Sequence, residues 1–92
     1  MPRKAAKVDA NQADIVKALR AVGATVTPAH TMGKGFPDLV VGYHGETYLL
    51  EVKTEDGTLT EDQKVWHAQW RGHKAIVRTR EEAWEAIGVE VK

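Results

Sequence analysis

The sequence predicts one α+β domain in which a mixed central sheet is flanked by helices. Its 92 residues are too few to divide into two parts that each bury a core. Apolar residues make up 42% of the chain and charged residues 28%, which is ordinary for a globular protein. Helix-like and strand-like segments follow one another in the order α-β-β-β-α-β-α, which indicates three helices packed against one four-stranded sheet.

The first predicted helix covers residues 11–22. Apolar residues recur there at spacings of three and four, at Ile15, Ala18 and Val22, and so mark one face of a helix. Gly23 is expected to end it, because glycine adopts the backbone conformation that commonly follows a helix.

Residues 1–8 contain three basic side chains and are expected to form an exposed basic arm, so that the domain itself spans residues 9–92. No apolar run approaches the roughly 20 residues needed to cross a bilayer, and the N-terminus lacks the apolar stretch of a secretory signal. We therefore expect a cytoplasmic protein with no membrane partner.

Three predicted strands follow the first helix. The first is a short segment with β-branched side chains, residues 24–28. The other two are rich in β-branched and aromatic side chains and cover residues 38–43 and 46–53. The last two strands are separated by His44-Gly45, which is typical of a two-residue hairpin turn. Residues 30–37 contain two glycines and a proline and are expected to form a loop.

The second predicted helix begins after Thr60 and runs to about Arg71. Thr60 and Gln63 have the spacing of a capping box, in which each side chain binds the other residue's backbone N–H. Gly72 is expected to end this helix.

Residues 74–78 form the predicted fourth strand, and a last helix begins after it. Thr79 is expected to cap that helix, with Glu82 at the capping-box position. Trp84 and Ile87 should face inward.

Composition limits the chemistry that the chain can carry out. The absence of cysteine excludes disulfides and thiolate zinc sites, so a metal ion must be held by oxygen or imidazole. The 13 basic and 13 acidic residues give a net charge of zero, which is not the footprint of a strong nucleic-acid binder. The net charge alone therefore gives no support for DNA binding.

The hairpin brings three polar side chains together. A symmetric turn pairs Tyr43 with Glu46, and the same register places Asp38 opposite Glu51. Directly opposed residues have Cβ atoms roughly 4.5 to 5.5 Å apart, and like charges so placed repel each other. Lys53 lies on the same face as Glu51 because strand side chains alternate. The two carboxylates therefore need a positive partner between them.

Two carboxylates and a lysine in this arrangement suit the hydrolysis of a phosphodiester. Asp38 and Glu51 can hold Mg²⁺ or Mn²⁺, with the backbone carbonyl of Val52 as a further oxygen ligand. Lys53 can orient or deprotonate the attacking water and stabilise negative charge that develops on the phosphate. No other small-molecule cofactor is indicated.

Pro37-Asp38 and Glu51-Val52-Lys53 resemble the motif of the PD-(D/E)XK nuclease superfamily. Residues 35–42, 50–53 and 59–63 together resemble its VRR-Nuc branch, in the small phage-type form related to Holliday-junction resolvases. The resemblance implies a restriction-endonuclease-like αβββαβ core with an added C-terminal helix. It further implies a metal-dependent DNA endonuclease specific for branched, flap or junction DNA, acting as a homodimer in a bacterial cell or a phage-infected host.

Two glutamines belong to the candidate site and each has two interpretations. Gln12 stands where related enzymes often carry a glutamate, and it is either a neutral member of the site or the capping-box partner of Asp9. Asp14 is close by but would sit on a different side of the helix. Gln63 either caps its helix with Thr60 or, by family resemblance, lies at the site beside the scissile phosphate.

The loop before Asp38 is a candidate for DNA contact, because exposed backbone N–H groups beside a cation suit a phosphate. Its alternative is a flexible connector. The candidate DNA-binding residues are His30, Gly33, Lys34 and Gly35, together with Lys64 on the second helix.

Other interpretations stay open at this point. Asp38, Glu51 and Lys53 can simply belong to a solvent-exposed face of the strands. The chain can also be a catalytically inactive module that binds nucleic acid or a partner. A third possibility is that the substrate is RNA. The tryptophans 66, 70 and 84 fit the core or a dimer interface better than base stacking. His67 and His73 have no acidic cluster at ligand spacing, so zinc is not expected.

Overall fold

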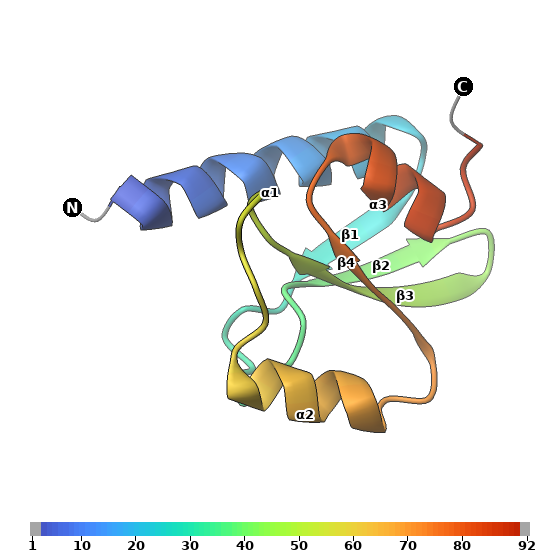
Figure 1. The fold of residues 1–92 in the computed structure, drawn as a ribbon. Coiled ribbons are helices and arrows are strands. Elements are labelled where there is room, and N and C mark those ends of the chain that lie inside the picture. Colours follow the sequence, from blue (N-terminus) through green and yellow to red (C-terminus); the bar gives the residue numbers. More distant parts are fainter. Residues whose placement is uncertain (1–2, 91–92) are drawn as a thin grey trace.

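The computed structural model describes residues 3–90, and side chains from residue 10 to residue 90. Its elements follow the predicted order (Figure 1). They are α1 Arg3–Ala21, β1 Thr25–Pro28, β2 Leu39–Tyr43, β3 Glu46–Val52, α2 Glu61–Gln69, β4 His73–Val77 and α3 Arg80–Ala86.

The four strands form one mixed sheet in the order β1-β2-β3-β4. Strand β2 is antiparallel to both β1 and β3, and β4 runs parallel to β3. A parallel pair needs a crossover connection, which α2 and its flanking loops provide. Figure 1 shows α1 and α3 on one face of the sheet and α2 on the other. The predicted fold class is confirmed.

The hairpin between β2 and β3 has the predicted register. Tyr43 pairs with Glu46 and Leu39 with Leu50. His44 and Gly45 have φ angles of 48° and 81°, the two positive values that a tight hairpin turn requires. One further step outward along this register puts Asp38 opposite Glu51.

The core lies between the sheet and the helix pair α1 and α3. Trp84 packs against it and donates its indole N–H to the carbonyl of Ala18 on α1 at 2.9 Å. Ile87 is 2% exposed, so the inward orientation predicted for both residues is confirmed. The buried core residues are Ile15, Leu19, Ala24, Val26, Leu39, Val41, Leu50, Val52, Val77, Ala83 and Ile87.

Helix α1 begins at Arg3, eight residues before the predicted start. Asp9 is therefore inside the helix, and its interpretation as an N-cap that pairs with Gln12 is wrong. The side chains of the predicted basic arm, like residues 1 and 2 altogether, lie outside the described part of the chain. Between residues 3 and 90, no helix is both long and apolar enough to cross a membrane.

The caps of α2 and α3 differ in completeness. Thr60 and Gln63 form both bonds of the predicted capping box, although α2 ends at Gln69 rather than Arg71. Thr79 accepts the N–H of Glu82, as expected, at 3.0 Å. The Glu82 carboxylate accepts from the N–H of Arg78 at 2.6 Å instead of from that of Thr79. The predicted capping-box bond from the Thr79 N–H to Glu82 is therefore wrong.

Candidate active site

Asp38 and Glu51 lie at one end of the β2–β3 hairpin. Asp38 directly precedes β2, and its Oδ2 accepts the backbone N–H of Val52 at 2.9 Å. Glu51 is the penultimate residue of β3, and its neighbours in the strand face the core beneath α1 and α3. Because strand side chains alternate, Glu51 points to the opposite face, on which α2 lies.

Glu51 is a buried carboxylate that the described residues satisfy only in part. It is 2% exposed, and its Oε1 has no hydrogen-bond partner. Burial, reinforced by the neighbouring carboxyl of Asp38, raises the pKa of Glu51 from 4.5 to about 8, although Lys53 acts in the opposite direction. In the absence of a cation, the site therefore favours a proton on this carboxyl group.

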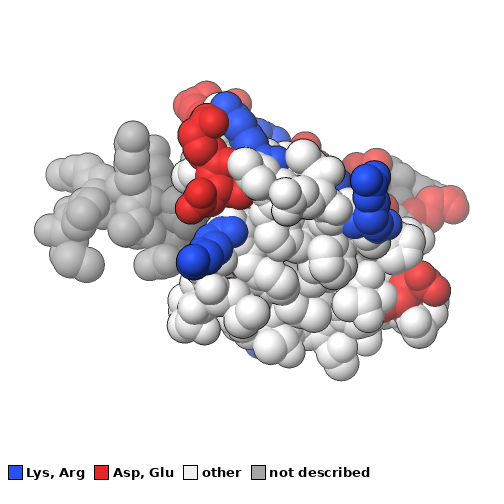
Figure 2. All heavy atoms as spheres, turned by 90° about the horizontal axis from the view of Figure 1, so that it is seen from below, with Lys and Arg blue, Asp and Glu red and all other residues white. Residues whose placement is uncertain are grey.

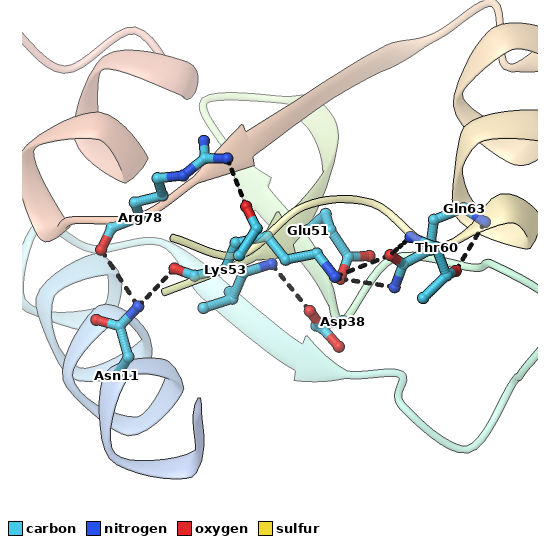
Figure 3. A network of polar contacts seen from close by, with 9 residues as sticks. Asn11, Asp38, Glu51, Lys53, Thr60, Gln63 and Arg78 are labelled. Carbon is cyan, nitrogen blue, oxygen red and sulfur yellow. Dashed lines mark hydrogen bonds and ion pairs between the residues drawn. The ribbon is translucent and has the colours of Figure 1, made fainter. Parts of the chain in front are cut away.

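Lys53 directly follows β3, and Gln63 of α2 holds it beside Glu51 (Figure 3). Its ammonium donates to Gln63 Oε1 at 2.8 Å and lies 3.7 Å from Glu51 Oε2. The Gln63 amide nitrogen donates to the same Glu51 oxygen at 3.1 Å. One side chain thus connects the lysine and the acid.

Gln63 also completes the cap of α2, so its two predicted roles coexist. Its Oε1 accepts the backbone N–H of Thr60 at 2.9 Å as well as the Lys53 ammonium. The side-chain carbonyl has two lone pairs and can accept both bonds. The start of α2 and the candidate site are therefore one hydrogen-bonded unit.

The donor set around Asp38 fits a hard divalent cation. The N–H and C=O of one strand residue point to the same side, so the carbonyl of Val52 faces Asp38, as its N–H does. Two carboxylates and this carbonyl are the oxygen ligands that Mg²⁺ or Mn²⁺ prefers. The unpartnered Glu51 Oε1 is the observation that fits a cation best. Within residues 10–90, no cluster of three or more acidic, histidine or cysteine side chains forms a metal site.

Gln12 and Asp14 lie on α1. Gln12 lines a surface hollow of about 440 Å³ along α1. Among the described side chains, it makes no hydrogen bond to Asp38, Glu51 or Lys53. Asp14 forms an ion pair with Arg80 of α3 at 2.7 Å and so serves the contact between two helices.

Asn11 reaches the site region although the sequence did not single it out. Its side-chain amide donates to the carbonyl of Lys53 at 2.9 Å and to that of Arg78 at 3.2 Å (Figure 3). These partners are 42 and 67 residues away in the chain. The spacing of residues within one short segment does not indicate hydrogen bonds between residues so far apart in the chain.

The loop before Asp38 packs against the start of α2. Gly33, Lys34 and Gly35 have consecutive positive φ angles of 70°, 52° and 84°. A Cβ at Gly35 would overlap the backbone carbonyl of Asp62, so only glycine fits there. Phe36 meets the ring of Trp66 edge-on with centroids 5.5 Å apart.

The other candidate DNA-binding residues are on the surface. His30 and Lys34 are exposed, and Lys64 is paired with Glu61 of its own helix at 3.1 Å. His73, which the sequence left without a role, pairs with Glu46 at 2.8 Å.

The α2 side of the molecule carries exposed apolar side chains. Trp66 and Trp70 stack with centroids 5.1 Å apart, and Trp70 is 40% exposed. Val65 of α2 is 55% exposed, and Met32, in the loop before β2, is 63% exposed. Figure 2 shows this side, and most of its centre carries neither basic nor acidic residues.

His67 is the buried polar residue of α2 on this side. It is 8% exposed, and its Nε2 has no hydrogen-bond partner among the described residues. Burial, with Lys74 and Lys53 nearby, lowers the pKa of His67 below 6.5. Lys74 binds the end of α2 through the backbone carbonyls of His67 and Trp70.

The four strands follow the order β1-β2-β3-β4, and an Asp, a Glu and a Lys lie at one end of the β2–β3 hairpin. A solved structure described as a VRR_NUC domain matches the chain with a TM-score of 0.73. The match has 23% sequence identity and covers 88% of this chain and 94% of the other. The chain thus has the fold of a VRR_NUC domain, as its motifs predicted. No family model and no curated protein matches it.

Proposed function

We propose that the chain is a metal-dependent endonuclease that hydrolyses DNA phosphodiester bonds, with branched, flap or junction DNA as its substrate. The observation that carries the proposal is the partly satisfied pair of opposed carboxylates, Asp38 and Glu51, beside an oriented lysine. A purely structural role does not explain why a strand end buries a carboxylate with one oxygen unpartnered.

Asp38, Glu51 and the carbonyl of Val52 would hold one Mg²⁺ or Mn²⁺. The bound ion supplies positive charge to the phosphate and lowers the pKa of a coordinated water. Gln12 adds no charge to this set, which favours one metal ion per site over two.

Lys53 acts on the water and on the phosphate. Its ammonium is held by Gln63 at 2.8 Å, so it does not have to be ordered during the reaction. A preorganised cation stabilises the negative charge that develops on the phosphate, and its N–H groups can orient the attacking water. Gln63 is therefore proposed as the residue that aims Lys53.

The substrate backbone would lie along the loop that precedes Asp38. Lys34 is exposed on that loop between two glycines, His30 is exposed four residues before it, and Lys64 is exposed on α2. Such contacts position a nucleic acid without reading its sequence. DNA rather than RNA is proposed on the resemblance of the fold and motifs.

The proposal includes a homodimer, because cutting two strands of a junction needs two sites. The exposed apolar side chains of Val65 on α2 and of Trp70 at its C-terminal end offer the interface. Its sparse charge favours a second copy of the chain over a nucleic-acid backbone.

The test compares cleavage of four-way junction, flap and linear duplex DNA by the purified chain with Mg²⁺ or Mn²⁺. We expect junction or flap DNA to be cut fastest, and Lys53→Ala, Asp38→Asn and Glu51→Gln to be slowed by orders of magnitude. Glu85→Gln is the matched control, because Glu85 is exposed on α3, on the opposite face of the sheet.

The proposal fails if neither metal supports cleavage, or if Lys53→Ala cuts as fast as the unchanged protein. Calorimetric titration with Mn²⁺ then separates the remaining cases. Saturable binding that Asp38→Asn abolishes supports the metal site, whereas DNA binding without metal binding would identify an inactive nucleic-acid-binding module.

A further inference from the structure

We propose that Asn11 is a positioning residue of this site, which fixes the backbone from which Lys53 reaches the reacting groups. The inference rests on the proposed function for its catalytic consequence. Its geometric part concerns α1 and the ends of β3 and β4, and it can be measured without any reaction.

Asn11 uses both hydrogens of its amide nitrogen on two strand ends. It donates to the carbonyl of Lys53 at 2.9 Å and to the carbonyl of Arg78 at 3.2 Å. These residues directly follow Val52 and Val77, the last pair of the β3–β4 ladder. We call these two bonds the Asn11 bridge, which Figure 3 shows as dashed lines at the ends of both strands.

The bridge completes the fixation of the Lys53 backbone. The N–H of Lys53 donates to the carbonyl of Val77 at 3.0 Å, and its C=O accepts from Asn11. Both main-chain polar groups of the lysine are therefore held, and its side chain leaves from a defined position. At the far end of that side chain, Gln63 holds the ammonium.

Arg78, the second residue of the bridge, also restrains the loop between Lys53 and Gln63. Its guanidinium donates to the carbonyl of Gly57 at 2.9 Å. Since that loop leads to Thr60 and the cap of α2, the same strand ends set the positions of both Lys53 and its partner. A displaced Asn11 bridge would move the lysine relative to the Glu51 carboxylate.

The chemistry of the bridge requires an amide. Asp at this position would place carboxylate oxygens against two carbonyl oxygens, and Ala would leave both carbonyls without the donor. The chain also offers a matched control. Arg20, on the same helix, donates to the carbonyl of Val26 at 3.0 Å and so ties α1 to β1, a strand that does not carry Lys53.

The test is a double-mutant cycle on cleavage, with kcat and KM measured separately. We expect Asn11→Ala to lower kcat on the order of 10- to 100-fold, as loss of an outer-shell partner typically does, with little change in KM. Asn11→Ala combined with Lys53→Ala should be no slower than Lys53→Ala alone. Arg20→Ala should keep kcat within about twofold, as expected for a site that does not interact with Lys53.

A second measurement follows the side-chain ¹⁵N resonance of the Lys53 ammonium by NMR in the metal-free protein. We expect Asn11→Ala and Asn11→Asp to shift this resonance or to speed its proton exchange, and Arg20→Ala to leave it unchanged. The inference is overturned if Asn11→Ala leaves it unchanged, or if the Asn11→Ala and Lys53→Ala effects on kcat multiply. Absence of cleavage by the unchanged protein would instead overturn the proposed function, and the NMR result would still decide the bridge.

Discussion

Gln63 shows how one residue can serve a helix and a reaction site together. Its carbonyl oxygen accepts from both Thr60 and Lys53, and its amide nitrogen donates to Glu51. From the sequence, cap and site were alternatives, because a capping-box pattern describes only the local bonds. The two roles are compatible because the long-range bonds use the remaining lone pair and N–H of the same amide.

Substitutions at Thr60 and Gln63 separate the capping role of Gln63 from its role at the site. Thr60→Ala removes the N-cap hydroxyl and should cost about 1 kcal/mol of stability while Lys53 keeps its partner. Gln63→Ala removes the cap bond and the lysine's acceptor, so it should slow cleavage at least tenfold more than Thr60→Ala. Thermal unfolding and cleavage rates check this, and equal cleavage rates for the two variants would contradict it.

The raised pKa of Glu51 predicts how stability changes with pH. The folded protein binds this proton more tightly than the unfolded chain does, since the pKa rises from 4.5 to about 8. The resulting stabilisation is full below pH 4.5 and is lost as pH rises through about 8. With a metal chelator present, the melting temperature of the protein should therefore fall as pH rises from 6.5 to about 9. The pKa of His67 in the folded protein lies below this pH range.

Two comparisons identify Glu51 as the source of that change. Glu51→Gln should lack most of the decrease, because its amide does not titrate. Added Mn²⁺ should offset the decrease at high pH, because a bound cation takes the place of the proton. A variant with the same pH slope as the unchanged protein would show that another group is responsible.

At the scale of elements, the sequence predicted the order of helices and strands more closely than the residues at which they begin and end. The symmetric turn at His44-Gly45 predicted the register of β2 and β3, which places Asp38 opposite Glu51. Helix α1 begins at Arg3 and not at residue 11 as predicted, because the alanine and lysine residues of the basic segment are good helix formers. Asn11 and His67 could not be found from the sequence, since their environments come from elements distant in the chain.

The contact between the 29–38 loop and α2 gives a test at this scale. Gly35→Ala would drive a Cβ into the Asp62 carbonyl, so the loop or the first turn of α2 must move. Gly23→Ala is the control, with a positive φ of 94° but open space around it, and should cost about 1 to 2 kcal/mol. We expect Gly35→Ala to lose more stability than this and to slow cleavage, because α2 carries Gln63.

Equal losses of stability in the two variants would show that the backbone conformation, and not the contact, makes glycine necessary at Gly35. Urea unfolding curves measure both costs on one scale. Cleavage rates then report whether the displacement reaches Gln63 and Lys53.

At the scale of the whole molecule, the two faces of the sheet are covered unequally. One face is sealed by α1 and α3 over the main core, and the other carries α2 and the candidate site. The α2 side also carries the exposed Val65 and Trp70. Scattered apolar residues are common on protein surfaces, but two large ones on a weakly charged side favour a protein partner.

A charge placed on this surface tests whether a second copy is that partner. We expect the unchanged chain to have the mass of a dimer by light scattering, and Val65→Glu to have that of a monomer, because burying an unpaired carboxylate at an interface is strongly unfavourable. Val65 is the better position than Trp70, whose indole N–H donates to the His73 carbonyl. Val65→Glu should still bind Mn²⁺, since Asp38 and Glu51 are unchanged, but should nick junction DNA without the paired second cut. A monomeric unchanged chain that makes both cuts would contradict the dimer and would assign both cuts to one site acting in turn.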